Sequence, residues 1–252
     1  MDELDDKSRR RRGIYLLPNL FTTAALFAGF YAVIAAIQGR FEPAAIAIFA
    51  AMLFDGLDGR VARLTNTQSD FGAQYDSLSD MVAFGVAPAL VAYEWALGGM
   101  GKIGWMAAFV YMAAAALRLA RFNTQVEIVD KRYFQGLASP AAAGTLVSTV
   151  WFFADQGISG ESVRWLMFIE TVLLGLLMFS RVRYFSGKSW PIGDRIPLGF
   201  MFLLVLIFVL LAIDPPTVLL IIGVVYVTSG IVVTLLGRQQ WKSRRGKKTA
   251  DD

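Results

Sequence analysis

The chain of 252 residues contains no cysteine and no histidine. Without these residue types there is no disulfide, no zinc site built on sulfur or imidazole, and no thiol or imidazole nucleophile. A Ser-His-Asp arrangement is excluded for the same reason. Any proton transfer that the chain catalyses must therefore use Asp, Glu, Lys, Tyr or water, and a metal site must be built from oxygen ligands.

Apolar and aromatic residues make up 56% of the chain, more than the roughly 45–50% usual in soluble domains. Stretches of roughly 20 mostly apolar residues are expected to span a membrane. The sequence contains eight of them, at 16–37, 42–63, 72–96, 103–122, 138–155, 163–182, 197–213 and 216–237. We therefore predict an all-α fold, a polytopic membrane bundle of about eight helices. One membrane domain over 16–237 would lie between basic cytoplasmic segments at 1–15 and 238–252.

The basic residues are distributed unevenly between the predicted loops. With the N-terminus in the cytoplasm, 21 of the 24 Lys and Arg residues fall on the cytoplasmic side, and only Arg40, Lys102 and Arg164 fall on the other. This asymmetry predicts a protein of the cell (inner) membrane with both termini inside, which requires an even number of spans. Membrane topology and attraction to anionic lipid explain the basic ends. Nucleic acid is not an expected partner, because no soluble domain presents these residues.

The second and third predicted spans carry acidic residues. Asp55 and Asp58 are three residues apart, and Asp76 and Asp80 are four apart, so each pair lies on one helix face. An antiparallel hairpin of the two spans would place all four carboxylates in one layer, the deepest roughly 12 Å below the surface at 1.5 Å per residue. Charges at this depth cost several kcal/mol each and normally face a cavity or a partner.

Four neighbouring carboxylates repel one another unless cations lie between them. Oxygen ligands select hard ions such as Mg²⁺ or Mn²⁺, and two such ions can clamp a phosphate group. Gly59 and Gly72 leave room for a ligand, and Arg63 offers a positive fork to a phosphate. The alternative is a structural role in which the carboxylates pair with Arg60 and Arg63. Burying so many charges for stability alone is energetically poor.

The acidic residues also belong to a longer motif. The string Asp55-Gly-Leu-Asp58-Gly59-Arg-Val-Ala62-Arg63, followed after eight residues by Gly72, Asp76 and Asp80, resembles the signature of the CDP-alcohol phosphotransferase family. Three flanking stretches resemble the integral-membrane phosphatidylserine synthases within that family, namely RVARLTNTQSDFGAQYDSLSDMVAFGVAPA, LRLARFN and FQGLASPAAA. The resemblance covers roughly residues 14–237.

The resemblance implies roles for residues of the motif. Two Mg²⁺ or Mn²⁺ ions would be bound by Asp55, Asp58 and Asp76, and Asp80 would approach the metals and act as the general base. The CDP group of CDP-diacylglycerol would be surrounded by residues of the motif and of the first span: Asn19, Thr22, Asp58, Gly59, Ala62, Arg63, Ser69 and Gly72.

The implied reaction transfers the phosphatidyl group of CDP-diacylglycerol to the hydroxyl of L-serine, giving CMP and phosphatidylserine among the membrane phospholipids. The serine would be bound by residues of the fourth span and the following loop: Arg118, Arg121, Asn123, Gly136 and Ser139. For the two arginines, anchoring at the cytoplasmic membrane surface is an equal alternative. Many relatives form homodimers, so the resemblance implies a homodimer as one arrangement of this chain.

Other functions stay open on the sequence alone. Within the family, the acceptor alcohol can instead be glycerol-3-phosphate, inositol phosphate or choline. A cation-coupled transporter would also carry intramembrane carboxylates, but along a route between the two faces rather than crowded toward one. Glu170, in the sixth predicted span, is expected to make a polar contact between helices and has no assigned catalytic role.

Overall fold

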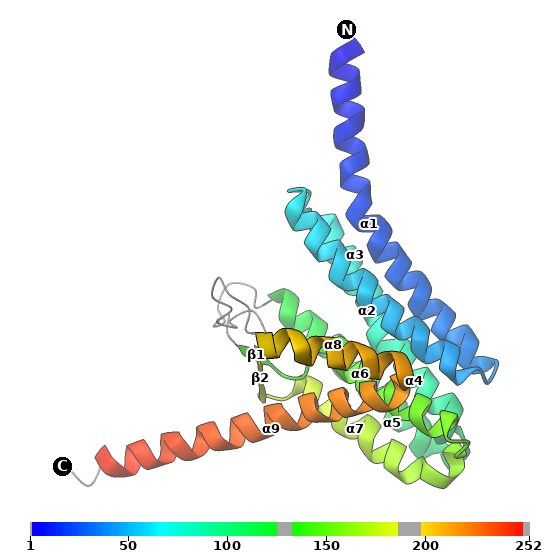
Figure 1. Cartoon of the computed structure of the whole chain (residues 1–252), viewed down its shortest axis with the longest axis vertical. Helices are drawn as coiled ribbons and strands as arrows, with labels where there is room; N and C mark the ends of the chain where they lie inside the picture. The colour runs from blue at the N-terminus through cyan, green and yellow to red at the C-terminus, as the bar shows by residue number, and fades with distance from the viewer. Residues whose placement is uncertain (1, 125–132, 186–197, 249–252) are drawn as a thin grey trace.

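The computed structural model describes residues 2–124, 133–185 and 198–248, which form a bundle of helices (Figure 1). The long helices are α1 (Asp2–Ile37), α2 (Phe41–Leu64), α5 (Lys102–Thr124), α6 (Ser139–Asp155), α7 (Arg164–Phe179), α8 (Leu198–Ile213) and α9 (Pro215–Lys248). Between α2 and α5 lie α3 (Asp70–Asp80), the π-helical turn η1 (Met81–Val86), α4 (Ala87–Ala92), a second π-helical turn η2 (Tyr93–Leu97) and the 3₁₀ turn η3 (Gly98–Met100). The 3₁₀ turn η4 (Gly160–Val163) precedes α7.

The prediction of a polytopic membrane helix bundle is confirmed, and each of the eight predicted spans coincides with helical structure over most of its described residues. Among the described residues, five helical stretches are long and apolar enough to cross a membrane: Leu17–Ile37, Asp70–Met100, Lys102–Thr124, Gly160–Phe179 and Pro215–Leu235. Helix α8 is a shorter apolar helix. The chain is therefore a multi-pass membrane protein, and the count of eight spans stays a prediction.

Both predicted basic ends continue the helix of the neighbouring predicted span. Helix α1 begins at Asp2 and runs without a break into the first span, and α9 continues beyond residue 237 to Lys248. In Figure 1 the two ends project away from the bundle in different directions. The boundaries predicted at residues 15 and 238 thus fall inside continuous helices, and residues 249–252 lie outside the described part.

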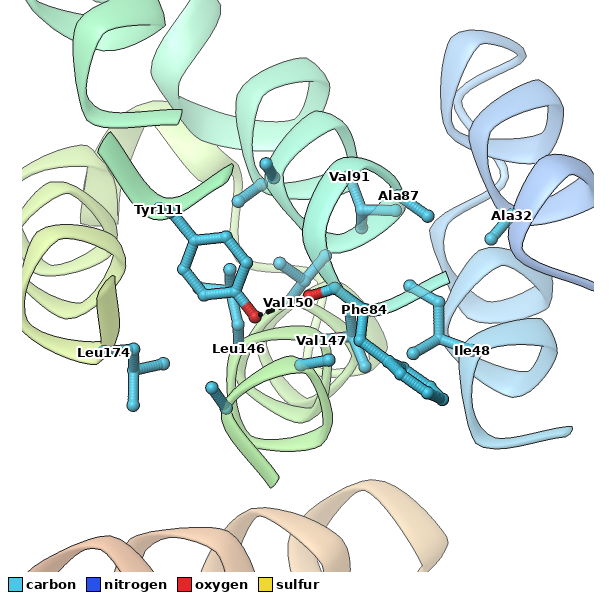
Figure 2. Packing of buried hydrophobic residues seen from close by; sticks show 14 of the residues in the cluster. Ala32, Ile48, Phe84, Ala87, Val91, Tyr111, Leu146, Val147, Val150 and Leu174 are labelled. Atoms are coloured by element: carbon cyan, nitrogen blue, oxygen red, sulfur yellow. Dashed lines mark hydrogen bonds between the residues drawn. The ribbon is translucent and has the colours of Figure 1, made fainter. Parts of the chain in front are cut away.

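Small residues let the first helices approach one another closely. The face of α1 toward the bundle and the facing part of α2 bury mostly alanine: Ala25, Ala28, Ala32, Ala35 and Ala36 on α1, and Ala44, Ala45, Ala47 and Ala51 on α2. A Cβ added at Gly29 would lie 2.7 Å from the Cα of Ala83 in η1. Since lipid supplies no hydrophobic force between helices, this tight packing is what associates them. Figure 2 shows Ala32 and Ile48 beside Phe84 at this contact.

The third predicted span, at 72–96, is helical but is not one regular α-helix. It widens into η1 after Asp80 and into η2 after Ala92. Pro88 gives a physical reason for the first widening, because a proline has no N–H to donate to the carbonyl four residues earlier. That carbonyl belongs to Phe84, and it accepts a hydrogen bond of 3.2 Å from the hydroxyl of Tyr111 on α5 (Figure 2).

Two short strands were not expected from the sequence. Strand β1 (Tyr133–Gln135) pairs antiparallel with β2 (Arg183–Phe185), so that Phe134 lies opposite Tyr184. Strands of three residues are too short to show an alternating pattern. The pair places the buried Tyr184 against α9, where its hydroxyl donates to the carbonyl of Val227 at 3.3 Å. The strand pair thus joins a segment that precedes α6 to a segment that follows α7, and Tyr184 attaches the pair to α9.

Candidate functional site

The hairpin of α2 and α3 brings the motif aspartates together. Asp55, Asp76 and Asp80 each offer a carboxylate oxygen, and these oxygens all lie within 4.8 Å of one another. Asp58 is only 5% exposed and joins the group through its contact with Asp76. The structure therefore gathers the four carboxylates that the spacing of the sequence placed in one layer.

Helix α1 holds this hairpin in place through polar contacts. The hydroxyl of Thr22 donates to Asp58 Oδ2 at 2.7 Å, and the hydroxyl of Ser79 on α3 donates to the backbone carbonyl of Thr22 at 3.0 Å. One turn further, the hydroxyls of Thr23 and Tyr75 lie 2.9 Å apart. Buried polar groups need such partners. Thr22 thus fixes one carboxylate oxygen of the acidic cluster.

The arginines next to the aspartates do not neutralise them. In the described part of the chain, neither Arg60 nor Arg63 forms an ion pair with any of the four, so the structural role through such pairs gains no support. The donor set is oxygen alone, the carboxylates are partly buried, and their oxygens are close enough to share a ligand. This set fits a hard divalent cation.

A pocket of about 260 Å³ opens beside the acidic cluster. Its lining includes all eight residues predicted to surround the CDP group: Asn19, Thr22, Asp58, Gly59, Ala62, Arg63, Ser69 and Gly72. The lining also contains Thr67, Gln68 and Ala73, to which the sequence analysis assigned no role. These three are not signature residues of the motif. Their position in or beside the loop that joins the two motif helices is the sequence feature that could have indicated a place in the pocket.

Two glycines shape the wall of this pocket. A Cβ added at Gly59 would meet no heavy atom within 4 Å, so the space beside it is open to a ligand. A Cβ added at Gly72 would lie 3.1 Å from Ser69 Oγ and 3.5 Å from Asn19 Oδ1. Ser69 is the N-cap of α3, and its hydroxyl oxygen accepts from the backbone N–H of Gly72 at 3.0 Å. Ser69 therefore has a structural role in addition to lining the pocket.

On the other side of Asp80, the structure joins two of the residues predicted to bind serine. Arg118 Nη1 donates to Ser139 Oγ at 2.9 Å, while its Nε is buried and has no hydrogen-bond partner among the described residues. Asp80 and Tyr226 of α9 are near enough to interact electrostatically with this guanidinium. Sequence reasoning missed Tyr226, because no local pattern indicates which helix the last span contacts.

The remaining residues predicted for the serine pocket point to other partners. Arg121 Nη2 donates to the side-chain oxygen of Gln135, and Asn123 Nδ2 donates to Ser77 Oγ at 3.0 Å. Gly136 has a φ of +83°, and a Cβ there would lie 2.3 Å from the carbonyl oxygen of Met178. Backbone conformation and close packing therefore account for this glycine.

Glu170 makes the interhelical contact expected of it. Thr149 Oγ1 of α6 donates to Glu170 Oε1 of α7 at 2.8 Å. The predicted polar contact between helices is confirmed.

A membrane helix bundle with an acidic cluster beside a pocket, and an arginine in the lining of that pocket, is the arrangement expected of a membrane enzyme that handles phosphate esters. Residues 15–179 match the family model described as CDP-alcohol phosphatidyltransferase, and the chain belongs to this family. The predicted family membership is confirmed.

Several relatives carry the name CDP-diacylglycerol–serine O-phosphatidyltransferase. The chain is 38% identical to one from Helicobacter pylori over 222 residues, which is 87% of this chain and 91% of the relative. It is 33% identical to one from Bacillus subtilis, over 67% of this chain and 89% of the relative. It is 39% identical to one from Methanocaldococcus jannaschii, over 54% of this chain and 61% of the relative.

The acidic cluster predicts a divalent-cation site that can be measured without any substrate. Titration of the purified protein with Mn²⁺, followed by the electron paramagnetic resonance signal of the free ion, should show saturable binding. Asp76→Asn should weaken this binding by roughly tenfold or more, since even groups that only support a ligand have effects of that size. Asp70→Asn, on the same helix but outside the cluster, is the matched control. Equal affinities in both variants would contradict the assignment.

Proposed function

We propose that this chain transfers the phosphatidyl group of CDP-diacylglycerol to the hydroxyl of L-serine, releasing CMP and leaving phosphatidylserine in the bilayer. The observation that carries the proposal is the direct opening of the aspartate cluster into a pocket lined by Arg63 and the motif glycines. The names of relatives that align over most of their own length support serine as the acceptor.

The donor side binds the nucleotide diphosphate. Arg63 lines the pocket and offers a planar, permanently charged fork to a phosphate. Gly59 has no side chain and Ala62 a small one, so the ligand can approach the backbone of α2 where these residues line the pocket. The four aspartates would hold two Mg²⁺ or Mn²⁺ ions, which, when bound, neutralise charge on the diphosphate and on the departing CMP.

The acceptor side binds serine through Arg118. Nη1 of this guanidinium donates to Ser139, and its Nε is buried without a hydrogen-bond partner among the described residues. The guanidinium therefore has donors left for a carboxylate. Ser139 orients this side chain from α6. With its carboxylate on Arg118, the hydroxyl of serine would be directed toward Asp80, which interacts with the same guanidinium.

The reaction is a direct displacement. Asp80 accepts the proton of the serine hydroxyl, because a carboxylate is the base available in a chain without histidine. The serine oxygen forms a bond to the phosphorus that carries diacylglycerol, and the bond from that phosphorus to the CMP oxygen breaks. CMP leaves into water, while the two acyl chains keep the product in the bilayer.

The uneven distribution of basic residues supports a cytoplasmic site in the cell (inner) membrane. Arg63, Arg118 and Arg121 belong to the basic side of the predicted topology. Serine is water-soluble, so it would reach Asp80 from the cytoplasm, and CDP-diacylglycerol would enter from the lipid.

The test is an assay of CMP release by the purified protein from CDP-diacylglycerol, with each of L-serine, glycerol-3-phosphate, inositol phosphate and choline, with and without Mg²⁺ or Mn²⁺. We expect release with serine that requires the divalent ion. Release with only another alcohol would reject serine as the acceptor. No release with any alcohol would reject the phosphotransferase itself.

In the same assay, Asp80→Asn should abolish turnover, because the amide cannot accept the hydroxyl proton. Binding of CDP-diacylglycerol should remain largely intact, since Asp55, Asp58 and Asp76 are unchanged. Near-normal turnover by this variant would refute the role of Asp80 as the base.

The pocket wall predicts different effects for two glycines of α2. Gly59→Ala places a methyl group in the open pocket without touching protein atoms, so it should raise the KM for CDP-diacylglycerol about tenfold without loss of stability. Gly56→Ala is the matched control, because a Cβ there also meets nothing within 4 Å but lies outside the pocket lining. Equal KM values for the two variants would contradict the assignment of the donor pocket.

The contacts of Arg118 predict which arginine binds the serine carboxylate. Arg118→Lys keeps the charge but removes the fork, so it should raise the KM for serine about tenfold and leave that for CDP-diacylglycerol unchanged. Arg121→Lys should have the smaller effect, because Arg121 donates to Gln135. If Arg121→Lys raised the serine KM more, the acceptor pocket would be misassigned.

A further inference from the structure

Pro88 interrupts the hydrogen bonding of the third span just after the residue assigned as the base. Its nitrogen carries no hydrogen, so it cannot serve the carbonyl of Phe84, four residues earlier. Between Asp80 and Pro88 the chain forms the π-helical turn η1, and at its end the N–H of Ala87 donates to the carbonyl of Val82, five residues back. The third span thus contains a wide turn directly after Asp80.

The hydroxyl of Tyr111 supplies the hydrogen bond that Pro88 cannot. It donates to the Phe84 carbonyl at 3.2 Å, and both residues are fully buried (Figure 2). A buried hydroxyl or carbonyl without a partner is costly, so the two groups need each other. Tyr111 lies seven residues before Arg118 on α5, about two helical turns, which puts both residues on one face of that helix.

The wide turn is also packed on two sides by small residues. A Cβ added at Gly29 of α1 would lie 2.7 Å from the Cα of Ala83. A Cβ added at Gly85 would lie 3.3 Å from the Cβ of Ala115 on α5. Helices α1 and α5 therefore contact the turn directly, and Tyr111 adds a hydrogen bond from α5 to it.

The orientation of Asp80 depends on this turn. Since an α-helix advances about 100° per residue, one extra residue in a turn rotates everything before it by roughly that angle relative to everything after it. Conversion of η1 to a regular α-helix would therefore turn Asp80 away from its neighbours, while the packing of α4 in the core stayed as it is.

We propose that Tyr111 is a positioning residue for the transfer reaction. Its hydroxyl replaces the N–H missing at Pro88, keeps the turn Met81–Val86 wide, and so holds Asp80 in register with Arg118, which projects from the same face of α5. The reaction that it serves is the proposed function, on which this inference rests.

The test is a cycle of four proteins: the wild type, Tyr111→Phe, Pro88→Ala and the double variant. Tyr111→Phe should lower kcat about tenfold or more and leave the KM for CDP-diacylglycerol within about twofold, because misplacement of a reacting group acts on the chemical step. Pro88→Ala should also lower kcat, since a regular helix can then form.

In the double variant, the unfolding temperature should behave differently from kcat. The fall in unfolding temperature caused by Tyr111→Phe should be smaller in the Pro88→Ala background, because residue 88 then has an N–H for the Phe84 carbonyl. Activity should not recover with it. Recovery of both in the double variant would show a merely structural role, and unchanged kcat in Tyr111→Phe would overturn the proposal.

Tyr93→Phe is the matched control, since Tyr93 lies in the same span and its hydroxyl has no hydrogen-bond partner among the described residues.

If the wild type releases no CMP with any alcohol, the proposed function fails. A distance measurement then tests whether Tyr111 and Pro88 set the position of α3 relative to α5. Spin labels at Phe71→Cys and Ile103→Cys are specific because the chain has no native cysteine. Tyr111→Phe and Pro88→Ala should each shift the distance between the labels, and an unchanged distance would reject the inference.

Discussion

Repulsion among four aspartates inside a membrane helix hairpin is the constraint on which the rest of the structure depends. Each charge at membrane depth costs several kcal/mol, and the carboxylate oxygens of Asp55, Asp76 and Asp80, which lie within 4.8 Å of one another, add to that cost. The chain offers the group one hydroxyl, that of Thr22, and no ion pair from Arg60 or Arg63 in the described residues. A cationic ligand would relieve this repulsion, and this property suits a site that binds divalent ions and phosphate.

Holding the carboxylates so close requires helices that cannot slide or rotate. In a bilayer the force for this comes from close packing and a few hydrogen bonds, which explains why alanine occupies the inner faces of α1 and α2, together with Gly29 on α1. The large apolar side chains point outward instead, as Leu20, Phe27 and Phe30 do on α1. The bond from Ser79 to the Thr22 carbonyl then fixes α3 against the same helix. Close packing of small residues thus holds the helices in the positions that the acidic cluster requires.

Local patterns predicted what depends on local spacing. Apolar length predicted the helices, and the separations of Asp55 from Asp58 and of Asp76 from Asp80 predicted their shared faces. What needed knowledge of distant partners was missed. The wide turn after Asp80 depends on a hydroxyl from α5, and the strand pair depends on three residues at each of two loop ends. Tyr226 approaches Arg118 only because the last helix packs against α6, which no pattern within α9 reveals.

The proposed donor and acceptor sides lie on different helices. The pocket and the aspartates belong to α1, α2 and α3, whereas Arg118 and Ser139 belong to α5 and α6. Helix α9, beyond the family match at 15–179, docks on α6 so closely that a Cβ at Gly223 would lie 2.6 Å from Thr145 Oγ1. This contact brings Tyr226 to the acceptor side. Asp80 on α3 interacts electrostatically with Arg118 of the proposed acceptor side. On the proposed function, we expect a change of acceptor alcohol to involve α5, α6 and α9 rather than the donor side.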